Sequence, residues 1–140
     1  MKKYLNCSLI YAIAAMIGGV FYREFTKWNG YQGITMLGKV HTHLFLLGMV
    51  IFLIVALYAE KYDLKSIKTF QLFFYFYNLG VPLTAIMMVV RGITEVKQLS
   101  LSTAASSAIS GIAGIGHILT GIGIVLLLLS LKKIKEGENE

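Results

Sequence analysis

The chain has 140 residues, of which 56% are apolar and only 14% are charged, and its 13 Lys and Arg outnumber its 7 Asp and Glu. A water-soluble domain carries roughly 25% charged residues because its surface must be hydrated. The composition therefore nearly excludes a soluble enzyme or a nucleic-acid-binding protein. The excess of bases is expected at the ends of membrane-spanning segments, in contact with lipid headgroups.

Four apolar segments are long enough to cross the hydrocarbon core as helices, which takes about 20 residues each. They cover residues 4–25, 37–59, 70–90 and 104–131. The polar links between them are too short to form separate domains. The sequence therefore predicts one transmembrane domain over residues 1–140, an all-α integral membrane protein folded as an up-down-up-down four-helix bundle in the lipid bilayer.

The first segment follows Lys2 and Lys3, as the apolar part of a signal peptide would. Its apolar run continues through Phe21, so we expect a retained helix. The segment ends in Arg23 and Glu24, which either neutralise one another or leave Arg23 in contact with an anionic group at the membrane surface.

The second segment opens with the sequence Val-His-Thr-His, which places His41 and His43 in its outer part. Two residues correspond to about 200° of helical rotation, so the two rings point to nearly opposite faces. At most one of them can therefore bind a given metal centre. Gly38 and Gly48 lack side chains near the His41 face and are expected to open a slot there.

The third segment contains Asn78 and Pro82. Pro82 cannot donate a backbone hydrogen bond to the carbonyl of Asn78, which predicts a kink. Asn78 itself is expected to form a hydrogen bond between helices. At the outer end of this segment, Arg91 either pairs with Glu95 one turn later or binds an anionic group of a ligand.

The fourth segment carries His117 near its centre, and its same-face neighbours are small: Ala113, Gly114, Thr120 and Gly121. Two interpretations stay open. Small residues allow two transmembrane helices to pack closely. They also clear the space that a flat porphyrin needs when a histidine ligates its iron, and helix bundles commonly hold cofactors between facing helices.

Depth in the membrane separates the two candidate partners of His117. His43 lies about 6 Å, and His41 about 9 Å, outward of the centre of the second segment. Depth therefore favours His43.

Three bases are expected at the outer ends of the helices: Arg23, Lys39 and Arg91. They are placed to bind the propionates of a haem, or to contact lipid headgroups.

More Lys and Arg fall on the side of the two termini than on the opposite side. The positive-inside rule therefore predicts a multi-pass protein of the cytoplasmic membrane with both termini in the cytoplasm.

The run from Val40 to Gly48 resembles the second transmembrane helix of haem–copper oxidase catalytic subunits, especially C-family oxidases and bacterial nitric oxide reductases. There a His-Thr-Asn sequence opens the helix, and its histidine is an axial ligand of the low-spin haem b. The resemblance implies His41 as the ligand, with His43 in place of the asparagine. Nothing in the chain matches the copper ligands or the catalytic tyrosine of the oxidases.

The oxidase subunit consists of three arcs of four helices, so resemblance to one arc implies a homo-oligomer, specifically a trimer. Over its whole length the chain is also similar to a family of small bacterial four-helix membrane proteins. The motifs that carry this similarity are Phe-Tyr-Arg-Glu-Phe at 21–25, His-Thr-His at 41–43 and Gly-His at 116–117. This second resemblance implies architecture and no activity.

These features predict a haem b-binding membrane protein, a minimal haem–copper oxidase-like module in electron transfer or in haem- or gas-linked redox chemistry. The expected iron ligands are His117 and His41, with His43 as the alternative to His41. Gly114 and Gly121 would make room for the macrocycle. An oxidoreductase would require an open coordination position on the iron.

Two other functions stay open. One is a small transporter or channel whose histidines relay protons or bind copper. The other is an assembly protein whose polar residues only join helices. Copper is the less favoured metal because the methionines are dispersed and not at ligand spacing. The electron donor also stays open.

Overall fold

The structure is a computed structural model that describes the backbone of residues 1–137 and the side chains of residues 1–134. Within this part the chain is entirely helical and contains no strand. The helices are α1 (Lys2–Trp28), α2 (Leu37–His43), the π-helix η1 (Leu44–Val50), α3 (Ile51–Lys61), the short 3₁₀ helix η2 (Leu64–Ser66), α4 (Lys68–Val96) and α5 (Thr103–Gly137).

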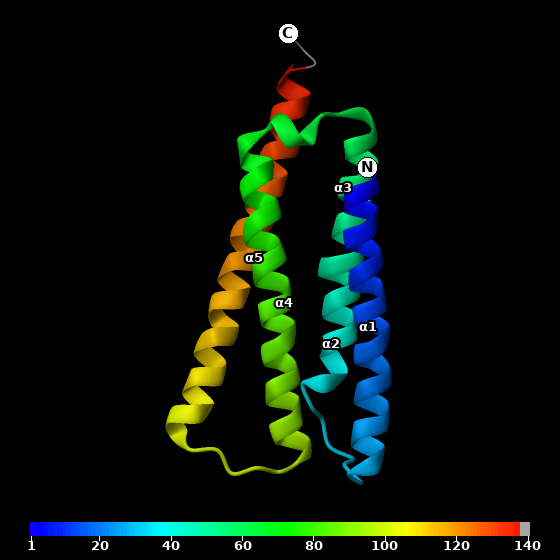
Figure 1. The fold of residues 1–140 in the computed structure, drawn as a ribbon. Coiled ribbons are helices and arrows are strands. Elements are labelled where there is room, and N and C mark those ends of the chain that lie inside the picture. Colours follow the sequence, from blue (N-terminus) through cyan, green and yellow to red (C-terminus); the bar gives the residue numbers. More distant parts are fainter. Residues whose placement is uncertain (138–140) are drawn as a thin grey trace.

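Four helices in the described part are long and apolar enough to cross a membrane, and α2, η1 and α3 together form the second of them. Successive helices run in opposite directions, and the start of α1 and the end of α5 lie at the same end of the bundle (Figure 1). The predicted all-α, up-down-up-down architecture is confirmed. Each helix extends a few residues beyond its predicted apolar span, because polar residues at the membrane surface continue it.

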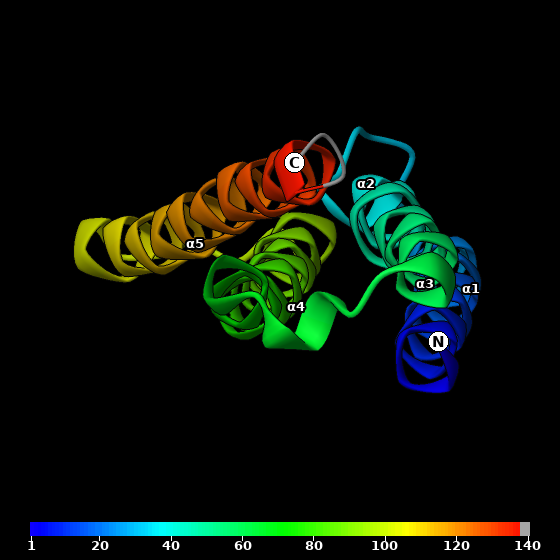
Figure 2. The ribbon, with the colours of Figure 1, turned by 90° about the horizontal axis from the view of Figure 1, so that it is seen from above.

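The bundle consists of two helical hairpins. One hairpin pairs α1 with α2, η1 and α3, and the other pairs α4 with α5, while α4 also contacts α2 and η1. Seen from above, α5 leans away from the first hairpin at its N-terminal end (Figure 2).

Small residues bring α4 and α5 together. A Cβ atom added to Gly80 would lie 2.5 Å from the amide nitrogen of Thr120 and 2.9 Å from the carbonyl oxygen of Gly116. A Cβ atom on Gly123 would lie 2.8 Å from the ring of Tyr77. Close approach through small side chains is the usual way in which transmembrane helices pack. The helix-packing interpretation is therefore correct for Gly116 and Thr120, on one face of α5.

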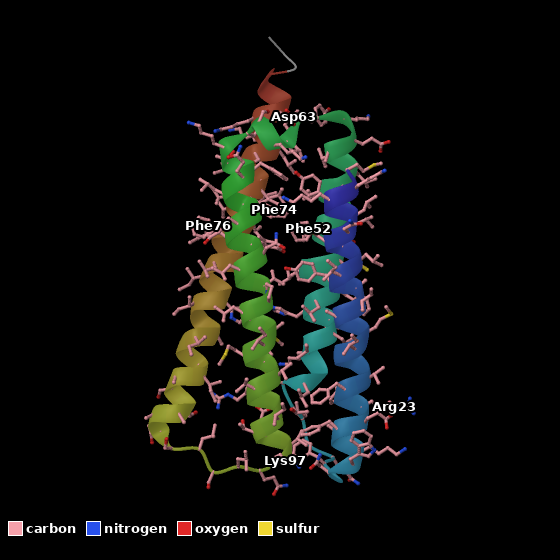
Figure 3. All side chains as sticks on the ribbon, in the orientation of Figure 1. Arg23, Phe52, Asp63, Phe74, Phe76 and Lys97 are labelled. Carbon is pink, nitrogen blue, oxygen red and sulfur yellow. The ribbon has the colours of Figure 1, made fainter. Side chains whose placement is uncertain are left out.

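Aromatic side chains join the two hairpins in the half of the bundle near the termini. Phe52 of α3 is fully buried, and its ring stacks on Tyr11 at a centroid distance of 5.6 Å. It also meets Phe73, Phe74 and Tyr77 of α4 at centroid distances of 6.1, 5.9 and 6.0 Å. Figure 3 shows Phe52 and Phe74 in the space between α3 and α4. This cluster holds α1, α3 and α4 to one another.

Asn78 forms the expected hydrogen bond between helices. Its amide oxygen accepts from the hydroxyl of Tyr11 at 3.3 Å, and its amide nitrogen donates to the carbonyl oxygen of Phe74 at 2.8 Å. The α4 helix continues through Pro82 without a break. Transmembrane helices tolerate an interior proline when neighbouring groups satisfy the backbone.

Substitution of Gly80 by alanine is expected to loosen the α4–α5 hairpin. The new methyl group would meet backbone atoms of α5, so the helices must separate, at a cost of about 1–3 kcal/mol. Thermal unfolding in detergent, followed by loss of helical circular dichroism, would measure the change. The matched control is Gly111→Ala, since nothing lies within 4 Å of the added atom there. Equal destabilisation by both substitutions would contradict this packing.

Candidate functional site: a histidine pair between the second and fourth spans

The side chains of His43 and His117 meet between two helices. Their ring centroids are 5.9 Å apart, and the rings are inclined by 71°, edge to face. His43 is the last residue of α2, and His117 lies in the middle of α5. The structure thus brings together the pair that depth in the membrane favours.

His41 lies on the opposite side of α2, facing α1. Its Cβ and Cγ atoms are 3.7 and 3.8 Å from the position that a Cβ atom on Gly19 would occupy. Its Nδ1 atom is buried and has no hydrogen-bond partner among the described residues. The expectation that the two histidines of the second span point to opposite faces is confirmed.

The expected slot beside His41 is wrong, because tyrosine rings of α1 fill it. A Cβ atom on Gly38 would lie 3.2 Å from the ring of Tyr22, and one on Gly48 would overlap the ring of Tyr11. These two glycines therefore serve the packing of α1 on the second span.

The glycines beside His117 are different. Nothing lies within 4 Å of a Cβ atom added to Gly111, Gly114 or Gly121. Gly114 and Gly121 lie three residues before and four residues after His117, on the same face of α5. Of the clearing that the sequence predicts around His117, Gly114 and Gly121 are open in the described structure, whereas Thr120 belongs with Gly116 to the face of α5 that packs on α4.

The ring of His117 is oriented by its own helix. Its Nδ1 atom lies 2.9 Å from the carbonyl oxygen of Ala113. A carbonyl oxygen only accepts, so Nδ1 carries the hydrogen, and in the neutral ring Nε2 then carries a lone pair. Metal-ligating histidines commonly donate their second nitrogen to a backbone carbonyl in this way. The His117 residue is exposed in the single chain.

The π-helix η1 starts directly after His43. A π-helix pairs each residue with the residue five positions later, and such segments are rare and occur frequently at functional sites. Two side chains from other helices donate to carbonyl oxygens of this segment. The hydroxyl of Tyr77 donates to the carbonyl oxygen of Leu47 at 2.8 Å, and that of Ser8 donates to the carbonyl oxygen of Met49 at 2.9 Å.

The η1 segment and its two hydroxyl donors were not predicted from sequence. The available signal was weak: hydroxyl side chains within apolar spans need a partner. Ser8 and Tyr77 are such residues, and both are buried. They fix the register of the second span and, with it, the direction in which His43 points.

The predicted pairing of Arg91 with Glu95 is wrong. The Arg91 guanidinium donates across to α5, to the hydroxyl of Ser106 at 3.2 Å, its carbonyl at 3.1 Å and the hydroxyl of Ser110 at 2.8 Å. The Glu95 carboxylate accepts from the backbone amide of Met36 at 2.8 Å. Bonding partners on a neighbouring helix thus replace the one-turn pair.

The three predicted bases lie in different places relative to the histidine pair. Ser110, which holds Arg91, precedes His117 by two turns, about 10 Å along the same face of α5. Lys39 is exposed one turn before His43 on the same face of α2. Arg23 lies on the outer side of α1 (Figure 3), 3.8 Å from Glu24, so the predicted neutralisation of these two is confirmed.

The histidine pair has no third ligand of the usual kind. Among the residues whose positions are described, no group of three or more His, Cys, Asp or Glu could hold a metal ion. The arrangement offers two imidazoles, an open face of α5 and two bases further along the helices.

Comparison with known proteins places the chain in a family. The family model described as "Protein of unknown function (DUF2871)" matches residues 1–134, so the chain belongs to this family. No curated protein and no solved structure matches it. The described structure has four helices long and apolar enough to cross a membrane, while the resemblance of residues 40–48 to haem–copper oxidases stays a prediction.

Substitution of Tyr77 by phenylalanine should destabilise the protein through η1. It removes the donor to the Leu47 carbonyl inside the membrane, where such bonds contribute roughly 0.6–1.7 kcal/mol. Unfolding in a graded series of denaturing detergent would measure the loss. Tyr75→Phe is the control, because that ring is 69% exposed. An unchanged stability of Tyr77→Phe would show that the hydroxyl does not support η1.

Proposed function

We propose that this member of the DUF2871 family is a haem b-binding integral membrane protein in which His43 and His117 are the axial iron ligands. The resemblance of the second span to haem–copper oxidases favours His41 as ligand, but His41 faces α1, and the contact between His43 and His117 favours His43. The proposed activity is electron transfer within the membrane.

The separation of the two rings carries the proposal. Metal–nitrogen bonds to imidazole are about 2.0–2.1 Å long, so two rings that ligate one metal from opposite sides have centres roughly 6 Å apart. The centres of His43 and His117 are 5.9 Å apart. The two rings are therefore close enough to ligate one metal together, which supports the proposal.

The number of ligands favours haem over a bare metal ion. Structural and catalytic sites for zinc use three or four protein ligands, and the tetragonal and trigonal copper sites of proteins also use more than two. The described residues supply only the histidine pair. A porphyrin brings four nitrogens of its own, so two axial histidines complete its iron.

The surroundings of the pair fit a macrocycle with acidic substituents. Gly114 and Gly121 leave the α5 face open on both sides of His117. Lys39 of α2 and Arg91, which reaches from α4 to Ser110 of α5, lie outward of the two histidines, where they would neutralise propionates. Arg23 lies on the outer side of α1 and so would not contact the same propionates.

Bound haem would supply a one-electron couple. The residues around the haem would set the properties of this couple. The Ala113 carbonyl fixes the ring of His117 and makes it a better ligand, and the apolar surroundings keep water away. Because His43 and His117 would both be used to hold the haem, the proposal is an electron carrier, whereas an oxidoreductase would need an open coordination position on the iron.

The same pair supports the alternative function, a proton relay or copper site in a small transporter. Two neighbouring histidines inside a membrane span suit proton transfer as well as metal binding. The ligand count argues against copper, and metal analysis distinguishes the two functions.

Orientation and assembly belong to the same proposal. The base distribution favours a location in the cytoplasmic membrane with the shared end of α1 and α5 in the cytoplasm. We propose a homotrimer, following the three arcs of the oxidase subunit.

The purified protein, made with ample haem supply, is expected to show a Soret band and about one haem per chain. His43→Ala and His117→Ala should each lower the haem content by about tenfold or more, since loss of a ligand costs at least as much as loss of its support. His41→Ala is the matched control and should keep the band. Absence of the band in the unsubstituted protein, or copper without iron, would contradict the proposal.

A further inference from the structure

Helices α1 and α4 are linked at both ends and separated between them. Near the termini, the ring of Tyr4 packs edge-on against Phe70 and Phe74 at centroid distances of 5.6 and 6.0 Å. At the other end, the ammonium of Lys97 lies 5.6 Å from the ring centre of Phe25. Lys97 stands at the lower end of α4 in Figure 3.

An apolar groove of about 620 Å³ lies between these two links. Its walls are α1 and α4, and its floor is Val40 and Leu44 of the second span. It differs from the histidine site, because Val40 and Leu44 lie on the α1 side of the second span. Almost all of its lining is apolar, and the exceptions stand at one end.

The polar end of the groove is closed by its own hydrogen bond. The Tyr11 hydroxyl donates to the amide oxygen of Asn78 at 3.3 Å, and the Asn78 amide nitrogen donates to the carbonyl oxygen of Phe74. The polar groups of Tyr11 and Asn78 therefore already have hydrogen-bond partners. A ligand needs no polar group at this end of the groove. The occupant of the groove is therefore apolar along its buried length.

The length of the groove matches one leaflet. Along α4 it runs from Asn78 to Val90, about 18 Å at the rise of an α-helix. Half of the hydrocarbon core is about 15 Å thick. On the α4 side the groove thus extends from near the bilayer centre toward the membrane surface opposite the termini, and on the α1 side it runs from Cys7 to Phe21.

Small residues leave this space open. Ala14 and Gly18 on α1 and Ala85 on α4 line the groove. Such residues normally let two helices touch. Here the bulky aromatic contacts at the two ends hold the helices apart, and an empty groove would lose the dispersion contacts of all its walls.

The open end of the groove is basic. Lys97, held over Phe25, is exposed at this end. Each base near a membrane surface attracts an anionic headgroup by about 1 kcal/mol. We propose that the groove binds one acyl chain of an anionic phospholipid from the leaflet opposite the termini, with its phosphate at Lys97.

Native mass spectrometry tests this site. The full chain is loaded with phosphatidylglycerol or phosphatidylcholine in mild detergent and then washed. The unsubstituted protein should keep one phosphatidylglycerol per chain. Ala85→Phe fills the groove and should lose it, whereas Ala108→Phe, on the exposed surface of α5, should keep it. Ala14→Leu, from the opposite wall, gives the same readout if Ala85→Phe does not fold.

The headgroup contact has its own pair of variants. Lys97→Gln should remove the preference for phosphatidylglycerol over phosphatidylcholine, and Lys27→Gln, two residues from Phe25 and so on the opposite face of α1, should not. Retention of lipid by both groove variants, or a copurified quinone or second chain in place of phospholipid, would overturn the proposal. The same spectra give the number of copies in the assembly, and the result does not depend on haem.

Discussion

Inside a bilayer, every backbone carbonyl needs a partner within the protein, and this requirement organises the second span. Within the π-helix η1, the carbonyl oxygens of Leu47 and Met49 accept hydrogen bonds from Tyr77 of α4 and Ser8 of α1. These two hydrogen bonds join α1 and α4 to neighbouring turns of the second span. They also fix the rotation of α2, which turns His43 toward α5 and His41 toward α1.

The glycines divide the bundle into packed and open faces. Gly48 of the second span and Gly80 and Gly123 of the other hairpin each receive a neighbouring side chain or backbone. Gly114 and Gly121, on the other face of α5, receive nothing. Both kinds look alike in the sequence, since each is a small residue at helical spacing. Only the positions of the neighbouring helices show which glycines serve packing and which leave room for a ligand.

Much of this arrangement follows from sequence because it depends on local rules. Composition and run length predict the four spans, and helical rotation predicts that His41 and His43 face opposite ways. The predictions that were wrong depend on contacts between segments that are distant in the sequence. The partner of Arg91 is a pair of serines on α5, and the slot beside His41 is filled by rings of α1. The hydrophobic pattern of residues 44–50 carries no mark of a π-helix, because it is apolar throughout.

The central claim is that η1 turns His43, and not His41, toward His117, and paired cysteines test it most directly. In a Cys7→Ser background, the variants H43C/H117C and H41C/H117C are treated with a short bifunctional thiol reagent in membranes. The account predicts rapid intramolecular cross-linking of H43C/H117C and none of H41C/H117C. Cross-linking of H41C/H117C alone would contradict it, whatever cofactor the protein binds.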